Sequence, residues 1–277
     1  DKGAAVHDLG SLGLQPAEEE RFAHAIARPH GAVLVTGPTG SGKSTTLYAA
    51  LLALNTPEKN IITVEDPVEY QLEGLTQVQV STKVGLTFAT GLRAMVRADP
   101  DVIMVGEIRD RETAQIAVES ALTGHLVLST LHTNDAPSAI TRLIEMGIEP
   151  FLVASALDCV LAQRLARTLC SGCKQRTIVP AEVLRESGYK VLVDLEAYEP
   201  VGCRRCGGTG YRGRLGIYEV MRLSSEIRRM ALERRSAEEI REVAVREGMR
   251  RLREDGLEKV RQGLTSVAEI ARVVGSS

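Results

Sequence analysis

The segment from Gly37 to Ser44 has the sequence Gly-Pro-Thr-Gly-Ser-Gly-Lys-Ser, which matches the pattern G-x-x-x-x-G-K-[ST] in full. It follows a short apolar run, Ala32–Thr36, and precedes a stretch with a helical pattern, Thr45–Leu54. A strand, a glycine-rich turn and a helix in this order let backbone N–H groups converge on phosphate oxygens. The motif therefore favours an α/β fold with a phosphate site at the end of one strand.

Each part of this motif has a separate chemical task. The glycines let the loop turn its N–H groups inward, Lys43 reaches the β- and γ-phosphates, and the Ser44 hydroxyl ligates Mg²⁺. The helix that follows directs its positive end at the same anion. We therefore expect the chain to bind ATP with Mg²⁺, through Gly37, Thr39, Gly40, Ser41, Gly42, Lys43, Ser44 and Thr45.

Further apolar runs alternate with helical patterns after the motif. The runs are Ile61–Val64, Val102–Val105 and Leu126–Leu131, and the predicted helices are 88–98, 112–122, 136–146 and 151–164. Continuous apolar strands separated by helices indicate a parallel sheet that is covered on both faces. We expect Cys159 to lie in the core, within the helix 151–164.

Two carboxylates follow predicted strands and are candidates for the chemistry of a phosphate site. Glu107 comes after Val102–Val105, where a P-loop enzyme needs a group that holds Mg²⁺. Glu65 ends the run that begins at Ile61, and ligands of parallel sheets bind beyond the carboxyl ends of the strands. We interpret Glu107 as the Mg²⁺ group, acting through water, and Glu65 as the base that orients the attacking water. The alternative for Glu65 is a turn or helix cap.

Two histidines, His125 and His132, flank the apolar run Leu126–Leu131. One histidine at such a place is usually structural, but the pair suggests a phosphate sensor, because imidazole can donate a hydrogen bond to a phosphate oxygen. Three arginines surround the predicted Mg²⁺ strand and could pair with phosphate or with carboxylates, although structural ion pairs are equally compatible: Arg93, Arg97 and Arg109.

Four of the five cysteines form two C-x-x-C pairs, Cys170 with Cys173 and Cys203 with Cys206. Two such pairs place four thiolates within reach of one tetrahedral Zn²⁺, and a site with four protein ligands is structural rather than catalytic. A metal would also explain how a glycine-rich segment with little core stays folded. Reduced, unpaired thiols are the alternative.

The pattern divides the chain after its first 14 residues into three parts. Residues 15–167 are expected to be the ATPase core, 168–216 the zinc subdomain and 217–277 a C-terminal helical subdomain. Ser236-x-x-Glu239 and Ser266-x-x-Glu269 are possible capping boxes in the last part. Between Arg204 and Arg261 there are 16 basic and 10 acidic residues, which favours a solvated face, with a contact surface for a partner as the alternative.

The overall composition narrows the possible functions. Hydrophobic residues make up 44% of 277 residues, enough for a sizeable core. Aromatic residues make up 3% and the net charge is −2, which disfavours a nucleic-acid reader with stacking rings and a basic surface. The sequence has no run of 18 apolar residues, so it predicts no membrane-spanning segment. Paired C-x-x-C cysteines suit a reduced cytoplasm.

The order of four motifs resembles the secretion-ATPase superfamily. These motifs are Gly37–Ser44, Val64–Tyr70, Val105–Asp110 and Leu122–Thr133, which are similar to the Walker A, Asp box, Walker B and His box of that family. The resemblance implies a RecA-like core that works as a cytoplasmic hexameric ring. It also implies that Glu65 is the catalytic glutamate, Glu107 the Walker B glutamate, and His125 and His132 the His-box pair.

The cysteines and two shorter stretches narrow the resemblance. The four cysteines are similar to the zinc module of assembly-type motors, and Gly91–Arg93 and Glu258–Gly263 look most like type II secretion ATPases, with type IV pilus assembly ATPases as the alternative. The resemblance implies partners in an inner-membrane platform, no nucleic acid, and a place at the inner face of the cytoplasmic membrane. In this family a preceding domain supplies arginines to the nucleotide site, so the resemblance implies that residues 1–14 are a linker from that domain. We therefore expect residues 1–277 alone to bind nucleotide but to hydrolyse it slowly.

Two functions from other classes remain as alternatives at this stage. RecA-like hexamers also drive DNA, so a nucleic-acid motor is one, and turnover stimulated by DNA would identify it. A nucleotide-gated assembly module, in which ATP only switches subunit contacts, is the other. Single-turnover hydrolysis would separate that module from an enzyme.

Overall fold

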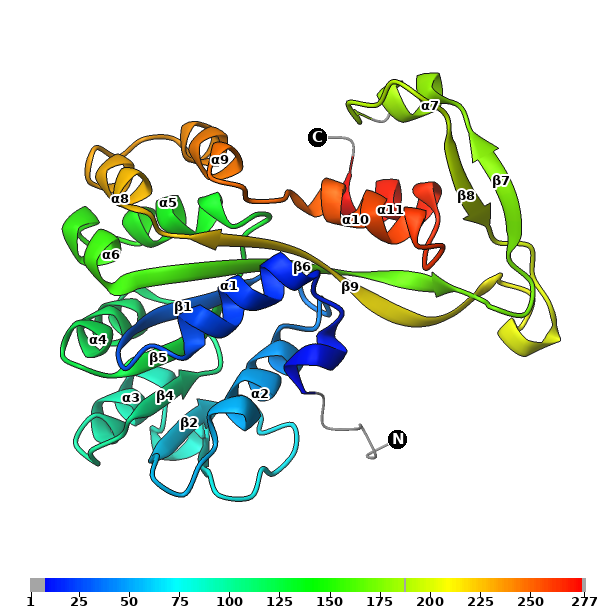
Figure 1. The fold of residues 1–277 in the computed structure, drawn as a ribbon. Coiled ribbons are helices and arrows are strands. Elements are labelled where there is room, and N and C mark those ends of the chain that lie inside the picture. Colours follow the sequence, from blue (N-terminus) through cyan, green and yellow to red (C-terminus); the bar gives the residue numbers. More distant parts are fainter. Residues whose placement is uncertain (1–7, 187, 276–277) are drawn as a thin grey trace. The chain divides into compact units, whose positions relative to one another are not determined.

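The computed structural model describes residues 8–186 and 188–275 (Figure 1). The chain forms two compact units, each made of two segments. Unit 1 ends its first segment at Ala162 and continues with Val220–Met249, and unit 2 comprises Gln163–Glu219 and the residues from Arg250 onward. Each unit is described by itself below.

Unit 1 is built on a largely parallel sheet with the strand order β3-β2-β4-β5-β1-β6-β9. Every residue of the three central strands β1, β4 and β5 is buried, which agrees with their continuous apolar runs. The strands β1 to β5 pair in parallel, as does β6 with β1. The bounds are β1 (Gly31–Thr36), β2 (Ile61–Glu65), β3 (Thr76–Gln79), β4 (Val102–Val105), β5 (Leu126–Leu131), β6 (Leu157–Leu169) and β9 (Tyr211–Arg222).

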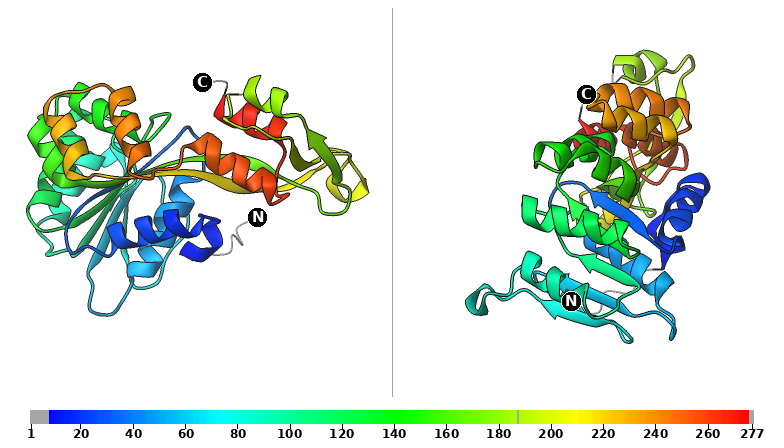
Figure 2. Two further views of the ribbon diagram at one scale, coloured as in Figure 1. Left: turned by 45° about the horizontal axis from the view of Figure 1, so that its top comes forward. Right: turned by 90° about the vertical axis from the view of Figure 1, so that its left-hand side faces the viewer.

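Helices cover both faces of this sheet (Figure 2). On one face α1 and α2 contact each other, and α2 packs on β1 and β5. On the other face α4 packs on β1 and β5 and contacts α3 and α6, and α5, α8 and α9 extend this layer. The bounds are η1 (Leu9–Leu12), α1 (Pro16–Ile26), α2 (Lys43–Leu54), η2 (Thr82–Val84), α3 (Phe88–Met95), α4 (Arg111–Leu122), α5 (Pro137–Glu145), α6 (Pro150–Ala156), α8 (Ser225–Leu232) and α9 (Ala237–Arg246).

The expectation of one helix over 151–164 was wrong. Helix α6 ends at Ala156, and β6 begins at Leu157. Cys159 is fully buried in this strand, and burial raises the pKa of its thiol to about 12. A run that is buried on all sides has no apolar period, so periodicity cannot separate a strand from a helix there.

Unit 2 contains the end of β6, the beginning of β9, a two-stranded antiparallel sheet and the last two helices, α10 and α11. Strands β7 (Gln175–Val179) and β8 (Leu195–Glu199) pair antiparallel, with Gln175 opposite Glu199. The remaining elements are α7 (Ala181–Glu186), η3 (Arg204–Cys206), α10 (Leu252–Arg261) and α11 (Val267–Val274). Helix α10 contacts α11 and β8, so the cysteine segment and these helices fold as one unit.

The predicted subdomain boundaries differ from this division. Within the predicted segment 217–277, α8 and α9 pack in unit 1 while α10 and α11 pack in unit 2. The predicted linker 1–14 lies partly outside the described residues, but its described part forms η1, which contacts α1 and α2 and buries Leu12. Amphipathic periodicity marks each helix but does not identify the surface that it covers.

Both predicted helix starts, Ser236 and Ser266, are N-caps. Ser236 and Glu239 form a full capping box, whereas Ser266 accepts a hydrogen bond from the Glu269 N–H while the Glu269 carboxylate binds arginines. None of the helices among residues 8–186 and 188–275 is long and apolar enough to cross a membrane.

Candidate functional site

The glycine-rich loop joins β1 to α2, as the motif predicts. Strand β1 ends at Thr36 and α2 begins at Lys43. Gly40 and Gly42 have φ angles of 78° and 89°, which residues with a Cβ rarely adopt. The glycines are therefore required by the backbone path that turns the loop into the helix.

The side chains of the loop fit a phosphate ligand. The Lys43 ammonium donates to the carbonyl oxygens of Gly37 and Pro38, at 2.9 and 3.0 Å, so its charge lies over the loop. The Ser41 hydroxyl is buried and has no hydrogen-bond partner within residues 8–186 and 188–275. Ser44 is exposed in the first turn of α2, where the free N–H groups and the helix dipole favour an anion. These groups could hold phosphate oxygens and one Mg²⁺.

The predicted carboxylates lie at the same edge of the sheet as this loop. Thr36 is opposite Leu131 in the ladder, Val105 is opposite Ser129, and Val64 is opposite Val105. Because these strands are parallel, their carboxyl ends lie at the same edge of the sheet. Glu65 is the last residue of β2, and three further site residues follow the ends of β1, β4 and β5: Gly37, Glu107 and His132. Strand β2 is three strands from β1, about 14 Å at the usual strand spacing, and β4 is two strands away.

Glu107 lies between two cationic or hydrogen-bonding partners. Its carboxylate is 2.5 Å from His132 Nε2 through one oxygen and 2.5 Å from Arg109 Nε through the other. Arg109 also approaches Asp66, at 3.4 Å, and the carboxylates raise the pKa of its guanidinium. The structure thus brings the Walker B-like glutamate, one histidine and one arginine together.

Gly106 permits the close packing of β4 and β2 next to this glutamate. Its N–H donates to Val64 O at 2.8 Å, and a Cβ at this position would lie 3.3 Å from the same oxygen and 3.4 Å from Glu65 Cα. A Cβ this close to the backbone of β2 would require that strand to shift by a few tenths of an ångström. The glycine before Glu107 is therefore explained by the spacing of the sheet.

Glu65 is buried, with 4% of its surface exposed, and its carboxylate is surrounded by neutral donors. The Tyr48 hydroxyl donates to Oε2, while the Thr63 hydroxyl and the Gln77 amide donate to Oε1 at 2.5 and 3.1 Å. Tyr48 lies on α2, Thr63 on β2 and Gln77 on β3. None of these three donors is among the site residues predicted from the sequence. The i, i+2 spacing of Thr63 and Glu65 could have placed Thr63 on the same strand face, but the other two contacts depend on topology.

A second group of residues, also not predicted from the sequence, links the phosphate loop to the segment after β5. The Thr36 and Thr133 hydroxyls are 2.7 Å apart, and the Thr133 hydroxyl donates to the Asp135 backbone oxygen at 2.9 Å. The Asp135 carboxylate accepts from Ser138 N–H, at the start of α5, and pairs with Arg241 of α9 at 2.6 Å. Helix α9 is therefore tied to the segment that carries His132.

His125 does not join the carboxyl edge. It precedes β5, whereas His132 follows it, and a six-residue strand separates them by about 20 Å. Its Nδ1 is 3.0 Å from Ser120 O. Within this chain, the paired-sensor hypothesis therefore has geometric support for His132 alone.

Of the predicted arginines, Arg93 pairs with Glu112, and Arg97 has no ion pair within the described ranges.

The four paired cysteines converge in unit 2. Their sulfur atoms all lie within 4.8 Å of one another. Cys170 and Cys203 Sγ are 3.9 Å apart, and Cys173 and Cys206 Sγ are 3.8 Å apart. Four sulfurs around one Zn²⁺, at the usual Zn–S distance of about 2.3 Å, lie about 3.8 Å apart. The donor set therefore fits a tetrahedral metal ion.

Backbone groups around the cluster favour thiolate. Burial opposes ionisation of Cys206, but the N–H groups of Cys203 and Gly210 donate to its sulfur at 3.1 and 3.2 Å. The balance lowers the pKa of this thiol to about 6. Such N–H donors also remain available to a metal-bound sulfur.

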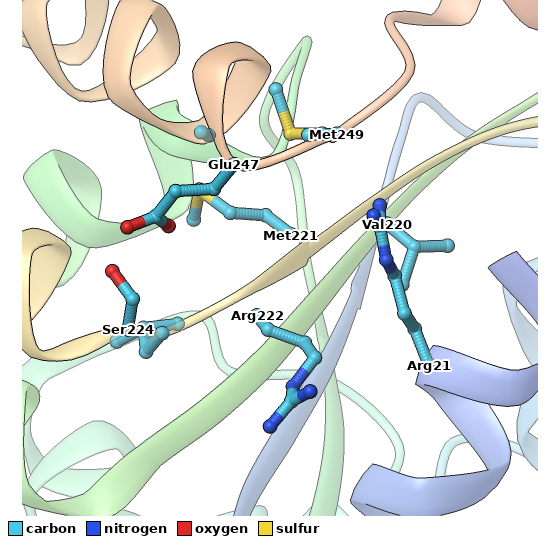
Figure 3. A pocket seen from close by; sticks show the side chains of 9 residues that line it. Arg21, Val220, Met221, Arg222, Ser224, Glu247 and Met249 are labelled. Carbon is cyan, nitrogen blue, oxygen red and sulfur yellow. The ribbon is translucent and has the colours of Figure 1, made fainter. Parts of the chain in front are cut away.

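A cavity of about 320 Å³ lies elsewhere in unit 1 (Figure 3). It is lined by the end of β9 and by residues from α1 and the α9 region, among them Arg21, Arg222, Glu247 and Met249. None of the predicted site residues lines it. The candidate nucleotide site is therefore the carboxyl edge of the sheet and not this cavity.

Comparisons with known proteins agree with the motif order. The family of type II/IV secretion system proteins matches residues 1–272. The type II secretion system ATPase E of Vibrio cholerae serotype O1 is 52% identical over 277 residues, which are 100% of this chain and 55% of that protein. The type IV pilus assembly ATPase PilB of Thermus thermophilus is 52% identical over 271 residues, 97% of this chain and 30% of that protein. The chain thus spans about half, or less, of these relatives.

The fold agrees with solved structures as well. The pilus retraction motor PilT, solved with bound ADP, superposes with a TM-score of 0.73 at 28% identity, over 99% of this chain and 68% of that one. The ATPase DotB of Legionella pneumophila gives a TM-score of 0.69 at 25% identity, over 96% of this chain and 64% of that one. The expected RecA-like α/β core is confirmed, and the chain belongs to the family of type II/IV secretion system proteins.

Proposed function

We propose that this chain is the ATP-hydrolysing motor region of a type II secretion ATPase. The observation that carries the proposal is a complete phosphate loop on the same sheet edge as two buried or half-buried strand-end glutamates, Glu65 and Glu107. The 52% identity to the Vibrio secretion ATPase, over the whole chain, supports ATP as the hydrolysed nucleotide and type II secretion as the system.

The proposed reaction converts ATP and water into ADP and phosphate. The loop N–H groups and Lys43 would hold the phosphate oxygens, and Ser44 and Glu107 would hold Mg²⁺, Glu107 through water. When bound, Mg²⁺ neutralises charge on the phosphates. Glu65 would orient the attacking water and accept its proton, and His132 would donate a hydrogen bond to a phosphate oxygen. His125 would act outside the phosphate site of its own chain.

The cysteine cluster is proposed to hold one structural Zn²⁺. Its four sulfurs would fill the coordination sphere, so the ion has no open position for chemistry. The support is the mutual spacing of the four sulfurs, together with the backbone N–H donors to Cys206.

The assembly is proposed to be a hexameric ring that acts on an inner-membrane secretion platform from the cytoplasmic side. A peripheral position, held by partners, requires no membrane span in this chain. Nucleic acid has no part in the proposal, since the net charge of −2 and the 3% of aromatic residues do not favour binding to a nucleic acid. Turnover that rises with added DNA would favour the motor alternative.

Assembly of a type IV pilus is the second candidate, because the Thermus PilB is also 52% identical. The two candidates share the chemistry and differ in the fibre that is built. Expression in two deletion strains, one lacking the secretion ATPase and one lacking the pilus assembly ATPase, separates them. Restored protein secretion supports the first candidate, and restored piliation supports the second.

The phosphate loop is tested by the Lys43→Ala substitution in the full-length protein. Removing the ammonium should abolish measurable ATP hydrolysis and secretion, while the circular dichroism spectrum and the oligomeric state stay unchanged. Equal ATPase activity in the two proteins at matched oligomeric state would overturn the proposed function.

A further inference from the structure

Three side chains from three different elements converge on Glu65. Tyr48 is on α2, the helix that begins with Lys43, whereas Thr63 and Gln77 are on β2 and β3. Thr63 and Gln77 are direct partners in the β2–β3 ladder, and Thr63 lies two residues before Glu65. The side chains of Thr63, Glu65 and Gln77 therefore share one face of the sheet. The Tyr48 hydroxyl reaches the same carboxylate from α2.

The contacts use most of the hydrogen-bonding capacity of the carboxylate. An ionised carboxylate can accept about four hydrogen bonds. The structure assigns one acceptor position of Oε2 to Tyr48 and two of Oε1 to Thr63 and Gln77. Among the contacts made by residues 8–186 and 188–275, one acceptor direction, on Oε2, is left for a water molecule.

The same donors also brace the segment that follows Glu65. The Tyr48 hydroxyl accepts from Glu69 N–H at 3.2 Å. The Gln77 amide donates to Tyr70 O at 3.2 Å, and its oxygen accepts from Leu72 N–H at 2.7 Å. The Tyr48 and Tyr70 rings pack with their centroids 4.4 Å apart. The network therefore fixes both the carboxylate and the chain next to it.

We propose that Tyr48, with Thr63 and Gln77, is a positioning residue that aims the free lone pair of Glu65 at the attacking water. This inference rests on the proposed function of Glu65. Because Tyr48 is five residues beyond Lys43 on the same helix, it also connects the phosphate-binding loop to the proposed base. A shift of that helix on nucleotide binding would move the donor that holds Glu65.

The test is steady-state ATP hydrolysis by the full-length protein carrying Tyr48→Phe or Thr63→Val. Each substitution keeps the size of the side chain and removes one donor to Glu65. We expect kcat to fall roughly tenfold, the scale of one hydrogen bond to a charged group, with KM for ATP within about twofold of wild type. Tyr211→Phe, which deletes a hydroxyl bound to Ser266 in unit 2, should leave kcat unchanged.

The same substitutions in a Glu65→Gln background separate positioning from general stability. If Tyr48 acts through Glu65, Tyr48→Phe should cause little further loss in the double variant. A wild-type kcat in Tyr48→Phe, an equal loss in both backgrounds, or a loss expressed in KM would overturn the positioning role while leaving the proposed function intact. Wild-type turnover by Glu65→Gln alone would remove Glu65 from the chemistry, and the positioning role with it.

Discussion

At the residue scale, the two glutamates of the sheet edge differ in their surroundings. Glu107 is held by Arg109 and His132, whereas Glu65 is held by neutral donors. A carboxylate already paired with a guanidinium is suited to electrostatic work on a cation or phosphate. A carboxylate held only by hydroxyl and amide groups has no cation competing for its oxygens, and it suits a base that must contact water.

Substitution of Glu107 tests this difference. Glu107→Gln removes a charge that would contact the hydration shell of Mg²⁺ and releases the Arg109 guanidinium. We expect the Kd of the Mg²⁺–nucleotide complex to rise about tenfold, while nucleotide binding in the presence of a chelator changes little. Calorimetric titration of both proteins with ADP, with and without Mg²⁺, measures this. Equal weakening under both conditions would show that Glu107 does not act through the metal.

At the element scale, one buried carboxylate connects the last helix, α11, to strand β6 within unit 2. Glu269 of α11 is 1% exposed, and it pairs with Arg167 and Arg272, each at 2.7 Å. Burial opposes its ionisation, but the hydrogen bonds from the two arginines lower its pKa to about 2. The last helix is thus fastened to β6 within the unit.

This lowered pKa predicts how the stability of unit 2 depends on pH. In the unfolded chain the pKa of this carboxyl group has its ordinary value of 4.5, so between pH 4.5 and about 2 the unfolded state binds more protons than the folded state. The stabilisation is therefore fully present above about pH 5 and is lost as the pH falls toward 2. Because the two arginines are half exposed and solvent weakens their attraction to Glu269, we expect this ionisation to contribute about 2 kcal/mol to the free energy of unfolding at pH 7.

Urea unfolding of wild type and Glu269→Gln measures the effect. The chain has no tryptophan and four of its six tyrosines lie in unit 2, so tyrosine fluorescence reports mainly on that unit. The difference in unfolding free energy should be largest at pH 7 and shrink below about pH 4. Release of zinc at low pH affects both proteins and cancels in the difference. A difference that is constant from pH 7 to pH 3 would contradict the account.

The cysteine cluster makes a separate prediction for the same unit. The purified protein should contain about one Zn²⁺ per chain. Cys203→Ser should lose the metal and increase hydrogen exchange in residues 168–216, with little change in the P-loop and β1, because the four ligands all lie in unit 2. Elemental analysis and exchange measurements check this. A full equivalent of zinc in the variant would contradict a four-cysteine site.

At the scale of the whole molecule, the sequence was sufficient for the ATPase core because its motifs fix the local backbone. The strand–loop–helix around Gly37–Ser44 and the buried strands β1, β4 and β5 follow from glycine chemistry and from burial on both faces. Each C-x-x-C pair is likewise a short local motif, and two such turns can meet around one metal ion.

Features that depend on tertiary pairing could not be read in the same way. Strand β6 has the composition of a buried helix, and β9 leads the chain back to the core before α8. The donors to Glu65 come from α2 and β3, so only the topology reveals Tyr48 and Gln77 as its neighbours. The division of the C-terminal helices between two units likewise depends on which surfaces their apolar faces cover.

In the proposed function, this edge of the sheet hydrolyses ATP with Glu65 as the base. The most direct test of this function is phosphate release under single-turnover conditions by full-length wild type and Glu65→Gln, with Mg–ATP affinity measured in parallel. The account predicts an unchanged affinity and a rate lowered by roughly 10²-fold or more, the scale of a lost general base. Phosphate release by Glu65→Gln at the wild-type rate would contradict it.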